Sequence, residues 1–133
     1  MAEGTYHDLT FRIRYPECDP MGIVHHSVFL QYFEMGRIEL LRDFGHSYAD
    51  LEREGILFAV TKVQITYKAP ARFDDELTLR TRVVRQTHVR IDHAYELRRG
   101  EKLLAEGTTT IACLDREGRV RAIPEFLAPP ADV

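Results

Sequence analysis

The chain has 133 residues, of which 44% are hydrophobic and 29% charged, and its net charge is −3 at neutral pH. This length fits one domain, and we predict a single domain over residues 1–133 with a core from about residue 6 to 127. No basic run indicates nucleic acid, no window of about eighteen apolar residues could span a membrane, and the N-terminus lacks a signal-peptide pattern. The two cysteines lie far apart in the sequence and favour a reducing compartment, so we expect a cytoplasmic protein.

The first half of the chain predicts a strand and a long helix. Residues 9–15 alternate apolar and polar side chains with a period of two, which is typical of a half-buried strand. Residues 27–44 are apolar over most of a helical circumference, so this helix is expected to be buried. Gly45 ends it in the usual C-terminal position. Residues 47–54 predict a short polar helix.

The remaining chain predicts sheet. Alternating patterns cover residues 59–68, 77–83, 89–98 and 103–114, and residues 119–123 add a short extension. Short connections between the later strands favour antiparallel pairing. The order of strand, long helix and four strands predicts an α+β fold in which one antiparallel sheet wraps around the helix. Because one sheet cannot cover the helix completely, we expect a second copy of the chain to complete the cover.

A shaped loop over residues 15–22 joins the first strand to the long helix and carries one carboxylate, Asp19. Pro16 and Pro20 fix φ, and Gly22 permits a left-handed conformation. The first amides of a helix have no intrahelical partners, and the helix dipole is positive there. A carboxylate facing those amides can act as a base or nucleophile beside an oxyanion site. Asp is also a common loop and helix cap, so this stretch alone leaves a structural role equally open.

Residues 14–37 carry a motif that resembles the signature of hot-dog-fold acyl-CoA thioesterases: Arg14-Tyr15-x-x-Cys18-Asp19-Pro20-x-Gly22-Ile23-Val24-x-His26-x-x-x-Leu30-x-x-Phe33-Glu34-x-x-Arg37. More narrowly, it is similar to the 4-hydroxybenzoyl-CoA thioesterase class and its YbgC-type members. Residues 67–77 resemble the second recurring stretch of that family. The resemblance implies a five-stranded antiparallel sheet around one long helix, a homodimer or dimer of dimers, and hydrolysis of acyl-CoA.

The resemblance also implies roles for individual residues. Asp19 matches the catalytic carboxylate, and His26 matches the position whose backbone N–H points at the thioester carbonyl. We expect the amide of His25 to join it as a second oxyanion donor. Tyr15 matches a tyrosine that lines the same pocket, although its alternation pattern is equally that of a core residue. We assign substrate binding to four residues near the loop: Tyr15, Ile23, Val24 and His25.

The phosphates of coenzyme A need cations. The basic candidates are Lys68, Arg72, Arg82, Arg85, His88 and Arg90. For each of them, a solvated strand face is the competing interpretation. No His pair has the spacing of a helical zinc site, so we expect no metal. Coenzyme A is part of the substrate, so we expect no cofactor; an acyl carrier protein could replace it as the acyl donor.

Thioester hydrolysis can proceed with one carboxylate, a water molecule and an oxyanion site. Asp19 could serve as a general base on water or as a nucleophile, and the sequence leaves both routes open. Short aliphatic and aryl acyl groups also both remain open. The competing functions are a hydratase of the same fold, whose motif differs, and a non-catalytic acyl-CoA-binding module.

Overall fold

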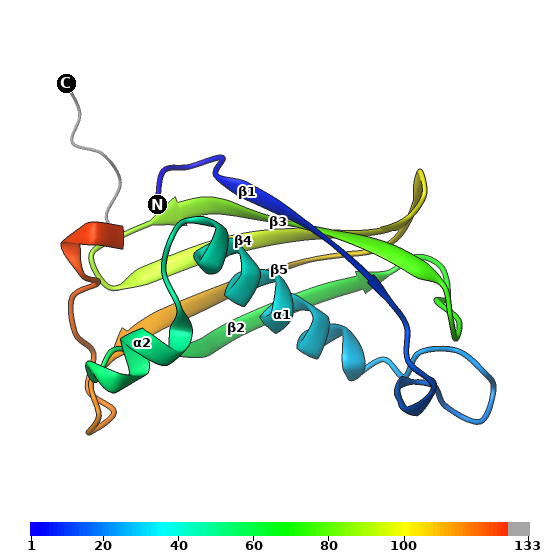
Figure 1. Cartoon of the computed structure of the whole chain (residues 1–133), viewed down its shortest axis with the longest axis horizontal. Coiled ribbons are helices and arrows are strands. Elements are labelled where there is room, and N and C mark those ends of the chain that lie inside the picture. The colour runs from blue at the N-terminus through cyan, green and yellow to red at the C-terminus, as the bar shows by residue number, and fades with distance from the viewer. Residues whose placement is uncertain (128–133) are drawn as a thin grey trace.

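A computed structural model describes residues 1–127, so the end of the predicted domain, residues 128–133, lies outside the described part. The described residues form one antiparallel sheet of five strands, in the order β1-β3-β4-β5-β2 (Figure 1). The elements are β1 (Tyr6–Arg12), the 3-10 helix η1 (Tyr15–Glu17), α1 (Val28–Asp43), α2 (Tyr48–Arg53), β2 (Leu57–Tyr67), β3 (Glu76–Gln86), β4 (Arg90–Arg99), β5 (Lys102–Leu114) and the 3-10 helix η2 (Glu125–Leu127). This arrangement confirms the predicted α+β fold with one sheet and one long helix.

Strand β1 begins and ends earlier than predicted, at Tyr6–Arg12 rather than at residues 9–15. Ile13 still exchanges backbone hydrogen bonds with residues 74 and 75, at 3.1 and 3.0 Å. The chain then turns into η1, where Pro16 has no amide hydrogen for a strand ladder. Tyr15 therefore does not continue the buried face of β1, and it is 74% exposed.

The short extension predicted after β5 is reduced to a single bridge. Residues 119–123 form only an isolated bridge, between Leu114 and Val120, and no strand of their own. Strands β2 to β5 match the alternation patterns within a few residues, and α2 follows Ser47, whose hydroxyl caps the helix by accepting from the amide of Asp50 at 3.2 Å.

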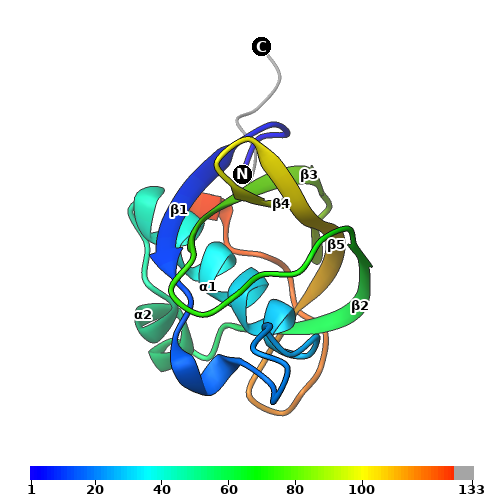
Figure 2. The ribbon, with the colours of Figure 1, turned by 90° about the vertical axis from the view of Figure 1, so that its right-hand side faces the viewer.

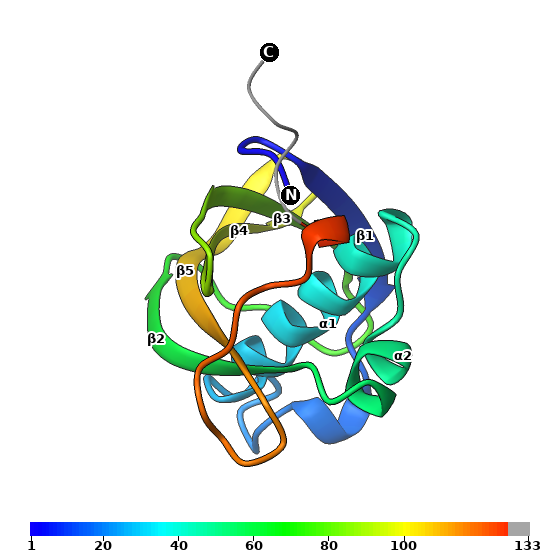
Figure 3. The same cartoon turned by 90° about the vertical axis from the view of Figure 1, so that its left-hand side faces the viewer.

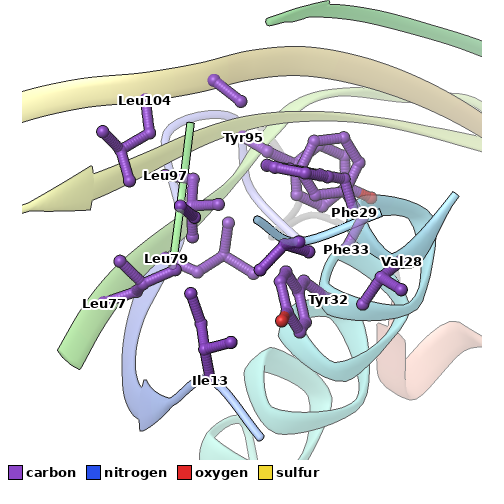
Figure 4. Close-up of a cluster of buried hydrophobic side chains, with 13 residues drawn as sticks. Ile13, Val28, Phe29, Tyr32, Phe33, Leu77, Leu79, Tyr95, Leu97 and Leu104 are labelled. Carbon is purple, nitrogen blue, oxygen red and sulfur yellow. The ribbon is translucent and has the colours of Figure 1, made fainter. Parts of the chain in front are cut away.

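The sheet curls around α1, as the two end-on views show (Figures 2 and 3). Side chains of α1 pack against β3, β4 and β5 in a continuous core (Figure 4). The ring of Phe33 stacks on Tyr95 with centroids 4.1 Å apart. Gly107 on β5 makes room for it, since a Cβ there would lie 2.7 Å from the Phe33 ring. Gly36 likewise lets α1 approach β3, where a Cβ would lie 2.2 Å from the hydroxyl of Thr81.

One side of α1 is left uncovered by the sheet. Leu30 and Met35 on α1 are exposed, and so are Val60 and Val63 on the edge strand β2. Phe44, which caps α1 one residue after its end at Asp43, is also exposed. Neither α-helix within residues 1–127 has the length and apolar character that a membrane crossing requires.

A polar group of side chains lies between α1 and the sheet, beyond Phe33. The guanidinium of Arg37 donates to the hydroxyl of Tyr95 at 3.0 Å, and that hydroxyl shares a 2.6 Å hydrogen bond with Thr109. His93 lies nearby and is 2% exposed. Desolvation, assisted by the charge of Arg37, lowers the pKa of His93 to about 3, so its imidazole stays neutral in the folded protein.

Candidate active site

The loop between η1 and α1 is held by a short set of backbone hydrogen bonds. We call residues 18–24 the Asp19 loop. Cys18 and Val24 form an isolated bridge at its base, and the amide of Asp19 donates to the carbonyl of Ile23 at 2.8 Å. Gly22 adopts φ +79°, the left-handed region that its lack of a Cβ permits. The loop is thus closed by its own backbone, as its Pro and Gly content predicts.

The Asp19 loop docks on the connection between β2 and β3. The amide of Val24 donates to the carbonyl of Ala71 at 2.8 Å, and Ile23 forms an isolated bridge with Arg72. These contacts bring two stretches together that are far apart in the sequence. They are also the two stretches on which the family resemblance depends.

The carboxyl of Asp19 uses only one of its oxygens inside the loop. Oδ1 accepts from the amides of Met21, at 2.8 Å, and Ile23, at 3.4 Å. The structural interpretation of Asp19 as a loop cap is therefore correct for this oxygen. No donor contacts Oδ2 within residues 1–127, and Asp19 lines a cleft. The second oxygen is free to meet a ligand.

The residues before α1 present one free amide rather than two. The amide of His25 donates to the carbonyl of Glu17 at 3.0 Å, so it is not available to an oxyanion, contrary to our expectation. The amide of Ser27 donates to Nδ1 of His25 at 3.2 Å. No acceptor contacts the amide of His26 in the part of the chain that the structure describes. The His25 ring instead packs on the His26 ring, with centroids 4.2 Å apart.

A cleft of about 380 Å³ opens between the start of α1 and the end of β2. Five of the predicted site residues line it: Asp19, Ile23, Val24, His26 and Lys68. Five further lining residues were not predicted: Phe29, Tyr67, Ala69, Pro70 and Ala71. All but Phe29 belong to residues 67–77, the second stretch of the family resemblance. Membership of that stretch is the feature of the sequence that could have identified them.

Tyr67 links the two walls of the cleft, which are the end of β2 and the segment before α1. Its hydroxyl donates to the carbonyl of His26 at 2.8 Å. Its ring lies edge-on to Phe29, with centroids 5.0 Å apart. Desolvation raises the pKa of Tyr67, so the hydroxyl remains a donor. The residue therefore holds the turn that carries the free amide.

The other predicted site residues lie outside the cleft of this chain. The ring of Tyr15 contacts Phe73, at a centroid distance of 5.4 Å, and neither residue lines the cleft. Arg72 adjoins the cleft through its bridge with Ile23, and no carboxylate lies within 4 Å of its guanidinium within residues 1–127.

Four of the predicted cations lie at the other end of the sheet: Arg82, Arg85, His88 and Arg90. They belong to the last part of β3, the turn after it and the start of β4, whereas the Asp19 loop lies beside the start of β3 (Figure 1). A single chain therefore does not bring this group to the cleft.

The cleft and its surroundings contain no metal centre in the described residues. Within residues 1–127, no three His, Cys, Asp or Glu side chains come together as a metal site would require. Within residues 1–127, the thiol of Cys18 makes its hydrogen bond to the carbonyl of Arg14, at 3.9 Å, and otherwise packs against the hydrophobic core. The chemistry available to the cleft is that of a carboxylate, a backbone amide and a mostly apolar wall.

The sequence model of the thioesterase-like superfamily matches residues 13–130. The chain is 31% identical to a putative acyl-CoA thioesterase, YneP, of Bacillus subtilis, over 79% of this chain and 77% of the relative. It is 30% identical to the acyl-CoA thioester hydrolase YbgC of Escherichia coli, over 87% and 88%. The crystal structure of a probable thioesterase from Bartonella henselae superimposes with a TM-score of 0.86 at 32% identity, covering 90% of this chain and 99% of that one.

Proposed function

The chain belongs to the thioesterase-like superfamily and is a thioester hydrolase, and on that premise we propose that it hydrolyses acyl-CoA at the Asp19 cleft. In this proposal the carboxylate of Asp19 is the base or nucleophile, and the amide of His26 is the oxyanion donor. The main support is one observation. Asp19 and His26 line the same cleft, and within the described residues Oδ2 of Asp19 has no donor and the amide of His26 has no acceptor.

In the base route, Asp19 takes a proton from water while the water oxygen bonds to the thioester carbon. The carbonyl electron pair moves to its oxygen, which accepts from the amide of His26. Collapse of this intermediate breaks the C–S bond, and the departing sulfur takes up the proton from Asp19. The products are the free acid and the free thiol, and the carboxylate of Asp19 is restored. A single donor of this kind contributes about 10²–10³ in rate where it has been removed in other enzymes.

In the nucleophile route, an oxygen of Asp19 bonds to the thioester carbon and expels the thiolate. The product is a mixed anhydride, which water hydrolyses to the free acid while the carboxylate is restored. The free oxygen of Asp19 supports either route. Both need Tyr67 in the same place, because its hydroxyl holds the carbonyl of His26.

The cleft supports a short aliphatic or an aryl acyl group. Its volume of about 380 Å³ lies toward the small end of ligand pockets. Its walls combine Val24 and Ala71 with the rings of Phe29 and Tyr67. Lys68, on the rim, and Arg72, beside it, are the cations of this chain best placed for phosphates, although Lys68 also contacts Glu106 at 3.5 Å.

A second copy of the chain would complete the molecule. The exposed side chains of α1 and β2 border a strand edge whose backbone has no partner in the described sheet. An isologous pairing there would cover Leu30, Met35 and Val63. We propose a homodimer or a dimer of dimers in the cytoplasm, with the cations at the far end of β3 offered to the partner's cleft. An acyl carrier protein remains an alternative acyl donor.

A thiol-release assay across aliphatic acyl-CoA chain lengths and aryl-CoAs tests the proposal. We expect turnover of a subset of short or aryl substrates, and a loss of about 10³-fold in kcat for Asp19→Asn. Asn keeps a side-chain oxygen for the amide of Met21, so the loop should stay closed. Tight binding of acyl-CoA without turnover would favour the non-catalytic module, and addition of water to an enoyl-CoA would favour the hydratase.

A further inference from the structure

A buried carboxyl lies at the base of the Asp19 loop and takes no part in the chemistry proposed above. Glu17 ends η1 and is 8% exposed. Its Oε1 accepts from the backbone amide of Arg14 at 2.7 Å, and Oε2 lies 3.3 Å from the Arg14 guanidinium. A buried carboxyl is unfavourable unless it is hydrogen-bonded, so these contacts explain how Glu17 is accommodated.

The same carboxyl also reaches the long helix. The hydroxyl of Tyr32, on α1, donates to Oε1 of Glu17 at 3.1 Å. Tyr32 is 1% exposed, and its ring packs against Phe11 and Phe29. Burial and then the charge of Glu17 raise the pKa of Tyr32, so its hydroxyl stays protonated and remains a donor. This hydrogen bond connects the first arm of the loop to α1.

The backbone of Glu17 holds the other arm. Its carbonyl accepts from the amide of His25 at 3.0 Å. This bond uses the amide that precedes the free one, so the amide of His26 is the next along the chain. Glu17 therefore contacts three segments. These are the residues after β1 through Arg14, α1 through Tyr32, and the segment before α1 through His25.

We propose that Glu17 and Tyr32 are positioning residues, whose buried carboxyl–hydroxyl pair fixes the Asp19 loop against α1 and so sets the separation between the Asp19 carboxylate and the His26 amide. The inference rests on the proposed function, because it assigns a role in that reaction. Neither Glu17 nor Tyr32 lines the cleft. Both act through other residues rather than on the substrate.

A positioning role predicts a particular kinetic pattern. Loss of the hydrogen bond leaves the cleft walls in place, so substrate binding should change little. The reacting groups would lose their fixed separation, and displacements of about 1 Å can lower rates by about 10²-fold. We therefore expect the change in kcat rather than in KM.

The test compares Tyr32→Phe, Glu17→Gln and the double variant with Tyr95→Phe as a matched control. Tyr95 is also 1% exposed, and its hydroxyl also has hydrogen-bond partners, but these are Arg37 and Thr109 in the core. The measurements are kcat and KM for thiol release, the melting temperature, and amide hydrogen exchange over residues 18–27.

We expect Tyr32→Phe to lower kcat about tenfold with KM within about twofold, and to speed exchange over residues 18–27. Glu17→Gln keeps an oxygen acceptor, so its loss of kcat should be smaller. The double variant should be no slower than Tyr32→Phe alone, because both substitutions affect one shared hydrogen bond. Tyr95→Phe should lower the melting temperature without lowering kcat at 25 °C.

Wild-type kcat and unchanged exchange in Tyr32→Phe would overturn the inference while leaving the proposed function intact. Equal losses of kcat in Tyr32→Phe and Tyr95→Phe, tracking the melting temperature, would overturn it as well. A wild-type chain that releases no thiol from any acyl-CoA would overturn the proposed function and this inference together.

Discussion

The Asp19 loop has a near twin at the other end of the described chain. Residues 114–120, which we call the Asp115 loop, follow β5. In both loops an Asp is followed three positions later by a Gly with positive φ, +79° in Gly22 and +80° in Gly118. The Asp amide donates to the carbonyl four residues on at 2.8 Å in both. Both are closed by an isolated bridge, Cys18 with Val24 and Leu114 with Val120.

The two carboxyl groups make the same local contacts. Oδ1 of Asp115 accepts from the amides of Glu117 and Arg119, both at 2.9 Å. Oδ1 of Asp19 accepts from the amides two and four residues on in the same way. An Asp side chain that bonds its own backbone two residues on is a common turn device. The loop geometry alone therefore carries no catalytic information.

The loops differ in what surrounds them. The Asp19 loop docks on residues 71 and 72, leads into α1, and is tied to that helix through Glu17 and Tyr32. The Asp115 loop leads instead to a segment without regular structure before η2, and Arg116 binds the carbonyl of Arg53 at the end of α2. The neighbours of such a turn, and not the turn itself, therefore decide whether its carboxylate can take part in a reaction.

The largest expected effect concerns the free amide of His26, which we assign only to the surroundings of the Asp19 loop. His26→Pro removes this donor, and we expect kcat to fall about 10²–10³-fold. His26→Ala keeps the amide and should retain activity within about tenfold. Thiol release, with circular dichroism to verify folding, checks both variants. Equal losses in the two variants would show that the side chain matters and the amide does not.

Acidification affects stability through a residue in neither loop. Desolvation, assisted by Arg37, lowers the pKa of His93 from its usual 6.5 to about 3. The unfolded chain therefore binds a proton below pH 6.5 that the folded chain refuses, so stability is greatest above that pH and falls as the pH drops toward 3. Between pH 7 and 5 this amounts to about 2 kcal/mol.

Urea unfolding at a series of pH values measures this loss. His93→Gln should flatten the slope between pH 7 and 5, while rates measured above pH 6.5 remain interpretable as chemistry at Asp19. An unchanged slope in His93→Gln would assign the pH dependence to other groups.

The smallest expected effects come from the paired glycines. A Cβ at Gly22 or at Gly118 would meet nothing within 4 Å. The cost of an alanine at either position is therefore only that of the left-handed backbone conformation. We expect Gly22→Ala and Gly118→Ala to lose about 1–2 kcal/mol each. Thermal unfolding should show similar shifts for both, and only Gly22→Ala should also lower kcat. Unequal shifts in melting temperature would mean that the two loops do not contribute equally to stability.

Much of the fold could be predicted because the hydrophobic patterns agree with the tertiary structure. The period-two runs mark β2 to β5, and the broad apolar face marks α1. The end of β1 could not be predicted from the alternation alone. Tyr15 fits the period of the strand, but the turn at Pro16 removes it from the sheet, and its ring contacts Phe73 instead.

The site could be predicted in part. Asp19 and His26 share a cleft, as the motif indicated, and Lys68 lines it. The hydrogen bond of the His25 amide to Glu17 could not be foreseen, because it depends on how the two arms of the loop meet. The four cations Arg82, Arg85, His88 and Arg90 lie close together in the sequence, yet β3 carries them away from the cleft along its length. Only the path of the strand reveals that separation.

The central claim is tested most directly by replacing the two matched carboxylates in one assay. Asp19→Asn and Asp115→Asn make the same chemical change in the same local geometry, so their melting temperatures should agree within a few degrees. We predict that kcat for thiol release falls about 10³-fold in Asp19→Asn and stays within twofold of wild type in Asp115→Asn. Wild-type turnover in Asp19→Asn, or equal losses in both variants, would contradict the account.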